Sequence, residues 1–432
     1  MTPLTRIARL SAAFLGSNLA RAAIGFGMSF AIARGLGAER FGRWILCTTW
    51  ASTLTVVVDL GFGVLLTRDG ARPEAEPGRL LSGALVLRLA LAVPLAALLY
   101  AGAGYLSPDV DTIAGLRAAA WLGTAGAAYG CFGALLRSQP RWLPAVLGVE
   151  TGWLALQLAG TWWIVHVGSG GSGGASWTIV SLLTLAVAVQ LGQIATAVMC
   201  WRRVFGNRGG VGLPSPDALA ALARRALPFA ASGLVANVQN RVGPLMLGYL
   251  STQSELGLFA AASRFGSVAR LAPQAVFGGA LPVLSHEHGR DRPGAERLFH
   301  TFDRVLLVLS AAIAAGCALL AAPMLRIVYG PSFVQAAPAL LWVSVGLIPL
   351  LSNSGRKVFL YASGGEALAV RWSAVALIVQ VCLGAVLIPT LGSVGAAVSV
   401  AAGEGVVWWP LRRATPRSAT TLNAERAELL CT

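Results

Sequence analysis

The sequence is short of charge, and above all of negative charge. Only 12% of its 432 residues are charged, and 33 lysines and arginines stand against 18 aspartates and glutamates. A soluble globular domain has about 25% charged residues, so this composition excludes an ordinary soluble protein. Apolar runs of about 20 residues, each long enough to cross a bilayer, recur along the whole chain. The composition therefore predicts a multi-span, all-α membrane protein.

Sequence signatures of catalysis and of metal binding are also missing. The six cysteines are scattered, mostly in apolar segments and without a C-x-x-C pair, which is typical of small buried side chains. His286-Glu287-His288 lacks the i,i+4 spacing of a zinc-binding helix, and there is no G-x-x-x-x-G-K-[ST] motif to bind ATP. No predicted outer loop is large enough for a catalytic domain. We therefore expect no enzyme activity, no cofactor and no metal.

The apolar segments predict twelve transmembrane helices with both termini in the cytoplasm. In this orientation only Arg34, Arg40, Arg43 and Arg326 among the basic loop residues fall outside, as the positive-inside bias requires. The arginines lie at helix ends rather than on one basic face, which argues against nucleic acid as a partner. The predicted segments are Ser11–Arg34, Phe41–Leu66, Leu80–Ala101, Thr112–Leu136, Trp142–His166, Trp177–Cys200, Ala226–Leu250, Glu255–Leu284, Thr301–Val328, Val334–Leu360, Ala367–Leu391 and Ser393–Leu411.

A basic segment rich in glycine and proline, Arg202–Asp217, separates six predicted helices from the next six. Because both halves then begin on the cytoplasmic side, they are expected to be parallel repeats. A faint internal match supports this: "ERFG", ending at Gly42, and "SELG", ending at Gly257, are each followed at the same spacing by Phe-Gly. The predicted parts are an N-lobe (1–201), a cytoplasmic linker (202–217), a C-lobe (218–411) and a cytoplasmic tail (412–432).

Several arginines lie deep inside predicted membrane helices. A guanidinium keeps its proton, and the bilayer centre costs it roughly 2.5–3.5 kcal/mol even on the mildest scales. Helical spacing puts amide side chains near some of them, and such polar stripes must face protein or water rather than lipid. The arginines are Arg21, Arg88, Arg241, Arg264 and Arg270, and the amides are Asn18, Asn237, Asn240 and Gln274.

The acidic residues inside the predicted helices are fewer, namely Asp59, Glu150 and Glu404. A structural ion pair remains an alternative for any single arginine, but three acids cannot neutralise five arginines. The surplus predicts a water-filled, positively charged cavity for an anionic substrate, and the planar guanidinium suits phosphate well. Buried carboxylates readily bind and lose protons, so the same three acids are candidates for coupling to H⁺ or Na⁺. The sequence leaves open whether ions or the membrane potential drive transport.

Four stretches resemble one family of transporters. They are "ARGLGAERFGRW", "LPFAASGLVANVQNRVGPLMLGYLSTQSELGLFAAASR", "VYGPSFVQAAPALL" and "LIPTLGSVGAAVSV". They occur in the expected order over almost the full chain. On these stretches the sequence resembles O-antigen-type polysaccharide flippases of the multidrug/oligosaccharidyl-lipid/polysaccharide (MOP, MATE-like) exporter superfamily.

This resemblance implies two six-helix lobes that form a V around a central cavity in the bacterial inner membrane. It implies the flipping of an undecaprenyl-diphosphate-linked oligosaccharide by alternating access, with polysaccharide polymerases and assembly proteins as further partners. Family members carry basic cavity residues in the first helix of each lobe, which Arg21 and Arg241 match. Arg356 and Lys357, near the inner end of the tenth segment, are predicted to form the cytoplasmic entrance.

Three alternatives stay open. A drug exporter of the same superfamily would bind cations and is expected to have a negative cavity. A membrane glycosyltransferase or polymerase would need larger outer loops. Nothing in the sequence excludes a scaffold of a glycan assembly complex without transport activity.

Overall fold

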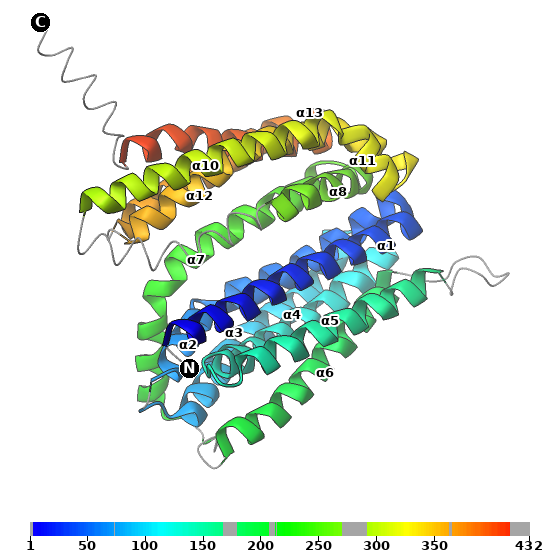
Figure 1. The fold of residues 1–432 in the computed structure, drawn as a ribbon. Helices are drawn as coiled ribbons and strands as arrows, with labels where there is room; N and C mark the ends of the chain where they lie inside the picture. The colour runs from blue at the N-terminus through cyan, green and yellow to red at the C-terminus, as the bar shows by residue number, and fades with distance from the viewer. Residues whose placement is uncertain are drawn as a thin grey trace, which may run out of the picture. The chain divides into compact units, whose positions relative to one another are not determined.

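The computed structural model describes residues 3–72, 74–166, 179–206, 212, 214–269, 292–362 and 365–414. Every regular element within these residues is helical (Figure 1). The chain divides into two compact units, Met1–Gly248 and Tyr249–Thr432. The predicted six-plus-six division into lobes stays a prediction.

The first unit contains α1 to α6 and nearly all of α7. Within it, α4 contacts α1, α3 and α6, and α5 contacts α1 and α6. This arrangement brings the polar faces of α1, α4, α5 and α6 together in the candidate site. The helices are α1 (Pro3–Asp59), α2 (Phe62–Gly70), α3 (Pro77–Leu106), α4 (Val110–Arg137), α5 (Leu143–His166), α6 (Ile179–Phe205) and α7 (Pro216–Leu250).

In the second unit, α12 contacts α13, α10 and α8. Its buried core includes Leu360, Ala369, Ala376, Val407 and Leu411. The elements are α8 (Gln253–Ala269), α10 (Arg292–Leu319), α11 (Ala321–Val328), the 3-10 helix η2 (Pro331–Ala336), α12 (Ala337–Ala362) and α13 (Glu366–Ala414).

Two very long helices are each kinked at a glycine. In α1 the backbone leaves the helical region at Gly37 (φ 76°, ψ 173°), and in α13 it does so at Gly392 (φ 52°, ψ −126°). Glycine adopts positive φ without the cost that a Cβ atom imposes. Both kinks lie where the sequence predicts a break between consecutive membrane helices.

Two other breaks were not predicted. The predicted helix Phe41–Leu66 is interrupted, because Leu60 (φ 42°) and Gly61 (φ 79°) turn the chain between α1 and α2. The predicted helix Thr301–Val328 is interrupted at Leu320, between α10 and α11. Residues on both sides of each break are apolar, so hydropathy does not show where the backbone turns.

Seven helical stretches in the described residues are long and apolar enough to cross a membrane. Two of them, Ala13–Asp59 and Ala367–Arg413, have 47 residues each and contain the kinks at Gly37 and Gly392. A single crossing needs about 20 residues, so each of these two is long enough to cross twice. The count of twelve and the cytoplasmic position of the termini stay predictions.

The N-terminus of α4, outside the predicted membrane segments, is fixed by Asp109. Its carboxylate accepts hydrogen bonds from the Thr112 backbone N–H (2.8 Å) and hydroxyl (2.7 Å) and pairs with Arg43 (3.0 Å). Partial burial alone would raise the pKa of Asp109, but these hydrogen bonds and the Arg43 charge hold it below its usual value. The cap joins α4 to the second half of α1, which also lines the site.

Candidate functional site

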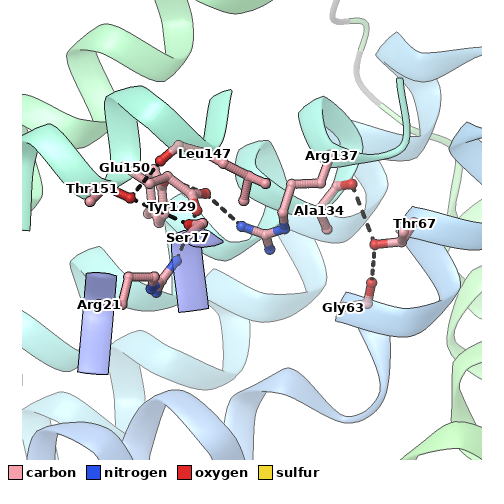
Figure 2. A network of polar contacts seen from close by, with 10 residues as sticks. All are labelled: Ser17, Arg21, Gly63, Thr67, Tyr129, Ala134, Arg137, Leu147, Glu150 and Thr151. Atoms are coloured by element: carbon pink, nitrogen blue, oxygen red, sulfur yellow. Dashed lines mark hydrogen bonds and ion pairs between the residues drawn. The ribbon is translucent and has the colours of Figure 1, made fainter. Parts of the chain in front are cut away.

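Glu150 is the centre of a polar cluster in the first unit (Figure 2). Its carboxylate accepts hydrogen bonds from Arg21 Nη1 (2.9 Å), Arg137 Nη1 (2.6 Å) and the Tyr129 hydroxyl (2.7 Å). These groups come from three helices, since Arg21 lies on α1, Tyr129 and Arg137 lie on α4, and Glu150 lies on α5. A hydrogen bond between the Ser17 and Thr151 hydroxyls (3.3 Å) also joins α1 to α5.

The members of this cluster differ in exposure. The Glu150 side chain is 4% exposed, whereas Arg21 is 44% and Arg137 is 30% exposed. A buried carboxylate needs such charged partners, because leaving it unpaired in a low-dielectric interior is costly. The two arginines exceed the one carboxylate by a positive charge. Arg21 also has five N–H donors in total, so its open side can bind another acceptor.

A cavity of about 400 Å³ opens beside the cluster. Arg21, Glu150 and Arg241 are the only charged residues among the described residues that line it. On α7, Arg241 Nη1 donates to the Asn237 carbonyl of its own helix (3.2 Å), and its buried Nε has no partner in the described residues. The other polar lining residues are Thr48, Ser52, Thr55, Tyr129, Gln157, Gln190 and Gln193.

Arg88 is not among the residues that line this cavity. It is only 2% exposed, and its Nη2 pairs with Asp59 Oδ1 (3.2 Å) while its Nη1 contacts the Cys131 sulfur (3.7 Å). Gly130 leaves room for the guanidinium, because a Cβ there would lie 2.8 Å from Nη1. The structure thus shows for Arg88 the structural ion pair that the sequence left open.

In the second unit, Arg356 is buried. It is 3% exposed, its Nη2 donates to Asp303 Oδ2 (2.8 Å), and its guanidinium lies 5.5 Å from the centre of the Trp408 ring. Ser352 donates to the other oxygen of Asp303 (3.1 Å). Asp303 lies at the start of a predicted membrane helix but was not among the residues predicted for the site.

Glu404 is also buried in the second unit, with 4% exposure. The Asn353 amide donates both to Glu404 Oε2 and to the Glu404 carbonyl, each at 2.8 Å. A neutral amide and a carboxyl therefore meet between α12 and α13.

The remaining predicted residues do not join the cavity. Asn18, Asn237 and Asn240 lie on α1 and α7 but are absent from its lining. Arg264 on α8 and Lys357 on α12 belong to the second unit. Arg270 and Gln274 lie outside the described residues.

Arg137 and most of the neutral polar residues that line the cavity were not predicted from the sequence. The sequence signal that could have identified part of this lining is the spacing of Gln190 and Gln193, which lie three residues apart in an apolar helix. A metal centre has no candidate in the described ranges, where no three His, Cys, Asp or Glu side chains come together.

Comparison with solved structures shows the fold. An inward-facing multidrug resistance MATE family transporter of the MOP superfamily superposes with a TM-score of 0.72 at 14% identity, covering 90% of this chain and 92% of that one. The lipid II flippase MurJ, in an inward closed conformation, gives 0.72 at 12% identity, with coverage of 94% and 87%. A MOP superfamily transporter from Pyrococcus furiosus, whose reverse pocket polarity suggests a different function, gives 0.61 at 15%, covering 95% and 94%.

Comparison of sequences gives the family. No curated protein matches the chain, but a family model described as lipid II flippase MurJ matches residues 271–430. A model described as polysaccharide biosynthesis protein matches residues 8–287, which is more than half of the chain. The chain therefore belongs to the polysaccharide biosynthesis protein family, with a multi-pass membrane fold like that of the MATE transporter and of MurJ.

Proposed function

We propose that this protein is a flippase that moves a polyprenyl-diphosphate-linked glycan from the inner to the outer leaflet of the bacterial inner membrane, for the synthesis of a surface polysaccharide. The observation that carries the proposal is the charge of the cavity in the first unit. Arg21 and Arg241 line the cavity and Arg137 bonds Glu150 beside it, so three positive charges stand against the one negative charge of Glu150. A diphosphate that links a lipid to a sugar carries two negative charges and would balance the surplus.

The proposed transport mechanism rests on the family to which the chain belongs and on the balance of charges at the cavity. We propose that the diphosphate enters from the cytoplasmic side, pairs with Arg21 and Arg241, and leaves on the outside after the two predicted lobes rock. The lipid tail stays in the bilayer throughout. Cytoplasmic termini, an entrance near Arg356 and Lys357, and contacts with a polymerase or assembly proteins belong to the same proposal.

The driving force has two candidate sources. An inside-negative potential favours the export of an anion by about 2.3 kcal/mol per charge per 100 mV. Coupling to H⁺ or Na⁺ through Asp59, Glu150 or Glu404 is the other source. Glu150 is held by two arginines, whereas the Glu404 carboxylate accepts from the neutral amide of Asn353.

The test is flipping of a fluorescent polyprenyl-diphosphate sugar in proteoliposomes. Arg21→Gln and Arg241→Gln should each lower the rate about 10–100-fold, because a charge-assisted hydrogen bond contributes about 1.5–3 kcal/mol. Arg117→Gln is the matched control, since Arg117 is an exposed arginine of α4 that lies outside the cavity. Full activity in both cavity variants would contradict the proposal.

A drug exporter of the same fold is the second candidate, favoured by the structural match to the multidrug transporter. Such a protein needs a negative or apolar cavity for cationic drugs. Here the single cavity carboxylate of Glu150 is already bonded to two arginines. Uptake of a cationic dye into inside-out vesicles, unaffected by Arg21→Gln, would support this candidate instead.

A further inference from the structure

Three amides that line the cavity have no protein partner among the described residues. Gln157 on α5 and Gln190 and Gln193 on α6 are half-buried and line the same cavity as Arg21. In the described part of the chain none of the three forms a hydrogen bond with another protein group. Polar groups inside a membrane protein must be satisfied by protein, water or ligand. These amides are therefore open to a ligand.

The part of the cavity lining that lies on α1 offers acceptors. The hydroxyls of Thr48, Ser52 and Thr55 line the cavity and donate their hydrogens to carbonyls of their own helix, at 2.9 Å, 2.9 Å and 3.0 Å. Their oxygen lone pairs can accept further hydrogen bonds. A ligand in the cavity would thus meet amide donors and acceptors as well as hydroxyl acceptors.

A contact between α5 and α6 positions the two helices that carry the glutamines. Trp153 Nε1 donates to Thr196 Oγ1 (3.1 Å), and a Cβ at Gly192 would overlap the Trp153 ring. Gln157 lies one helical turn after Trp153, and Gln193 follows Gly192 directly. Because this contact sets the register of α5 and α6, it fixes the positions on the cavity wall from which the three amides extend.

Along α5, the amide of Gln157 is set apart from Glu150. Gln157 is seven residues from Glu150 on the same helix, about 10 Å along its axis. No lysine or arginine other than Arg21 and Arg241 is among the described lining residues. An additional negative charge on the ligand would therefore find no further cation once a diphosphate is bound.

From these contacts we infer that Gln157, Gln190 and Gln193 form a subsite for the sugar next to the diphosphate, and that this sugar is an uncharged hexose or N-acetylhexosamine. The inference rests on the proposed function. Sugar hydroxyls and acetamido groups both donate and accept hydrogen bonds, as the amides do. The arginines then hold the diphosphate, which all polyprenyl-diphosphate-linked glycans share, while the amides distinguish the first sugar.

The test compares three lipids bound to the full-length protein in nanodiscs: polyprenyl diphosphate, the same lipid with N-acetylglucosamine, and the same lipid with a uronic acid. The wild type should bind the N-acetylglucosamine lipid about tenfold more tightly than the sugar-free lipid, since one or two net hydrogen bonds suffice for this. The uronic acid lipid should not share this gain. Gln157→Met with Gln190→Met and Gln193→Met should abolish the preference and leave sugar-free binding unchanged.

Two controls separate the possible failures. Gln335→Met removes an exposed amide of η2 in the second unit and should leave the preference intact. Thr196→Val, which removes the partner of Trp153, should weaken the preference without touching the amides. Equal binding of all three lipids by the wild type, or an equal loss for all three in the glutamine variant, would overturn the subsite while the flippase proposal stands. Failure of the wild type to bind any of them would overturn both.

Discussion

Arg21 and Arg88 lie on membrane helices of the same unit and each bonds a carboxylate, but their surroundings are opposite. Arg88 is enclosed, with 2% exposure, and its pair with Asp59 leaves it no access to a ligand. Arg21 is 44% exposed beside a polar cavity, although Glu150 holds it at 2.9 Å. An ion pair is therefore compatible with a structural role and with a binding role. The exposure of the guanidinium beyond its partner distinguishes the two.

The largest expected effect is on stability, when each arginine loses its carboxylate. Asp59→Asn leaves the Arg88 guanidinium charged and buried, so it should lower the free energy of unfolding by about 3–5 kcal/mol. Glu150→Gln should cost about 1–2 kcal/mol, because Arg21 and Arg137 are open enough to be hydrated. Denaturant unfolding in detergent micelles measures both. Equal losses would remove the distinction between the two arginines.

A smaller effect is expected from crowding the enclosed arginine. Gly130→Ala places a methyl group 2.8 Å from Arg88 Nη1 and should lower the free energy of unfolding by about 1–3 kcal/mol, because the buried guanidinium must shift. Gly102→Ala is the matched control in α3, where a Cβ meets nothing within 4 Å. That change should stabilise the protein by up to about 1 kcal/mol. If both substitutions behave alike, the enclosure of Arg88 is looser than the structure shows.

The sequence predicts much of the helical architecture, for physical reasons that particular residues show. Apolar runs separated by glycine locate the kinks at Gly37 and Gly392. The turn at Leu60 and Gly61 was missed, because the flanking residues are as apolar as the interior of a helix. Hydropathy indicates whether a segment lies in lipid or in water, but it gives no information on the backbone angles of that segment.

The site was predictable only in its charged part. Arg21, Arg241 and Glu150 were found because charges are rare and costly within a membrane, and the structure brings all three to one cavity. Gln157, Gln190 and Gln193 were not selected, since neutral amides alter the hydropathy of a segment little. They come from two helices of the five that line the cavity, so only the packing of α5 against α6 shows that they belong together.

The central claim, that the surplus positive charge of the cavity binds a diphosphate, is tested most directly by changing that surplus in steps. Arg21→Gln lowers it by one charge, and Glu150→Gln raises it by one. Binding of polyprenyl diphosphate at constant ionic strength should weaken about tenfold in the first variant and should be at least as tight as wild type in the second. Affinities that do not follow this order in folded protein would contradict the account.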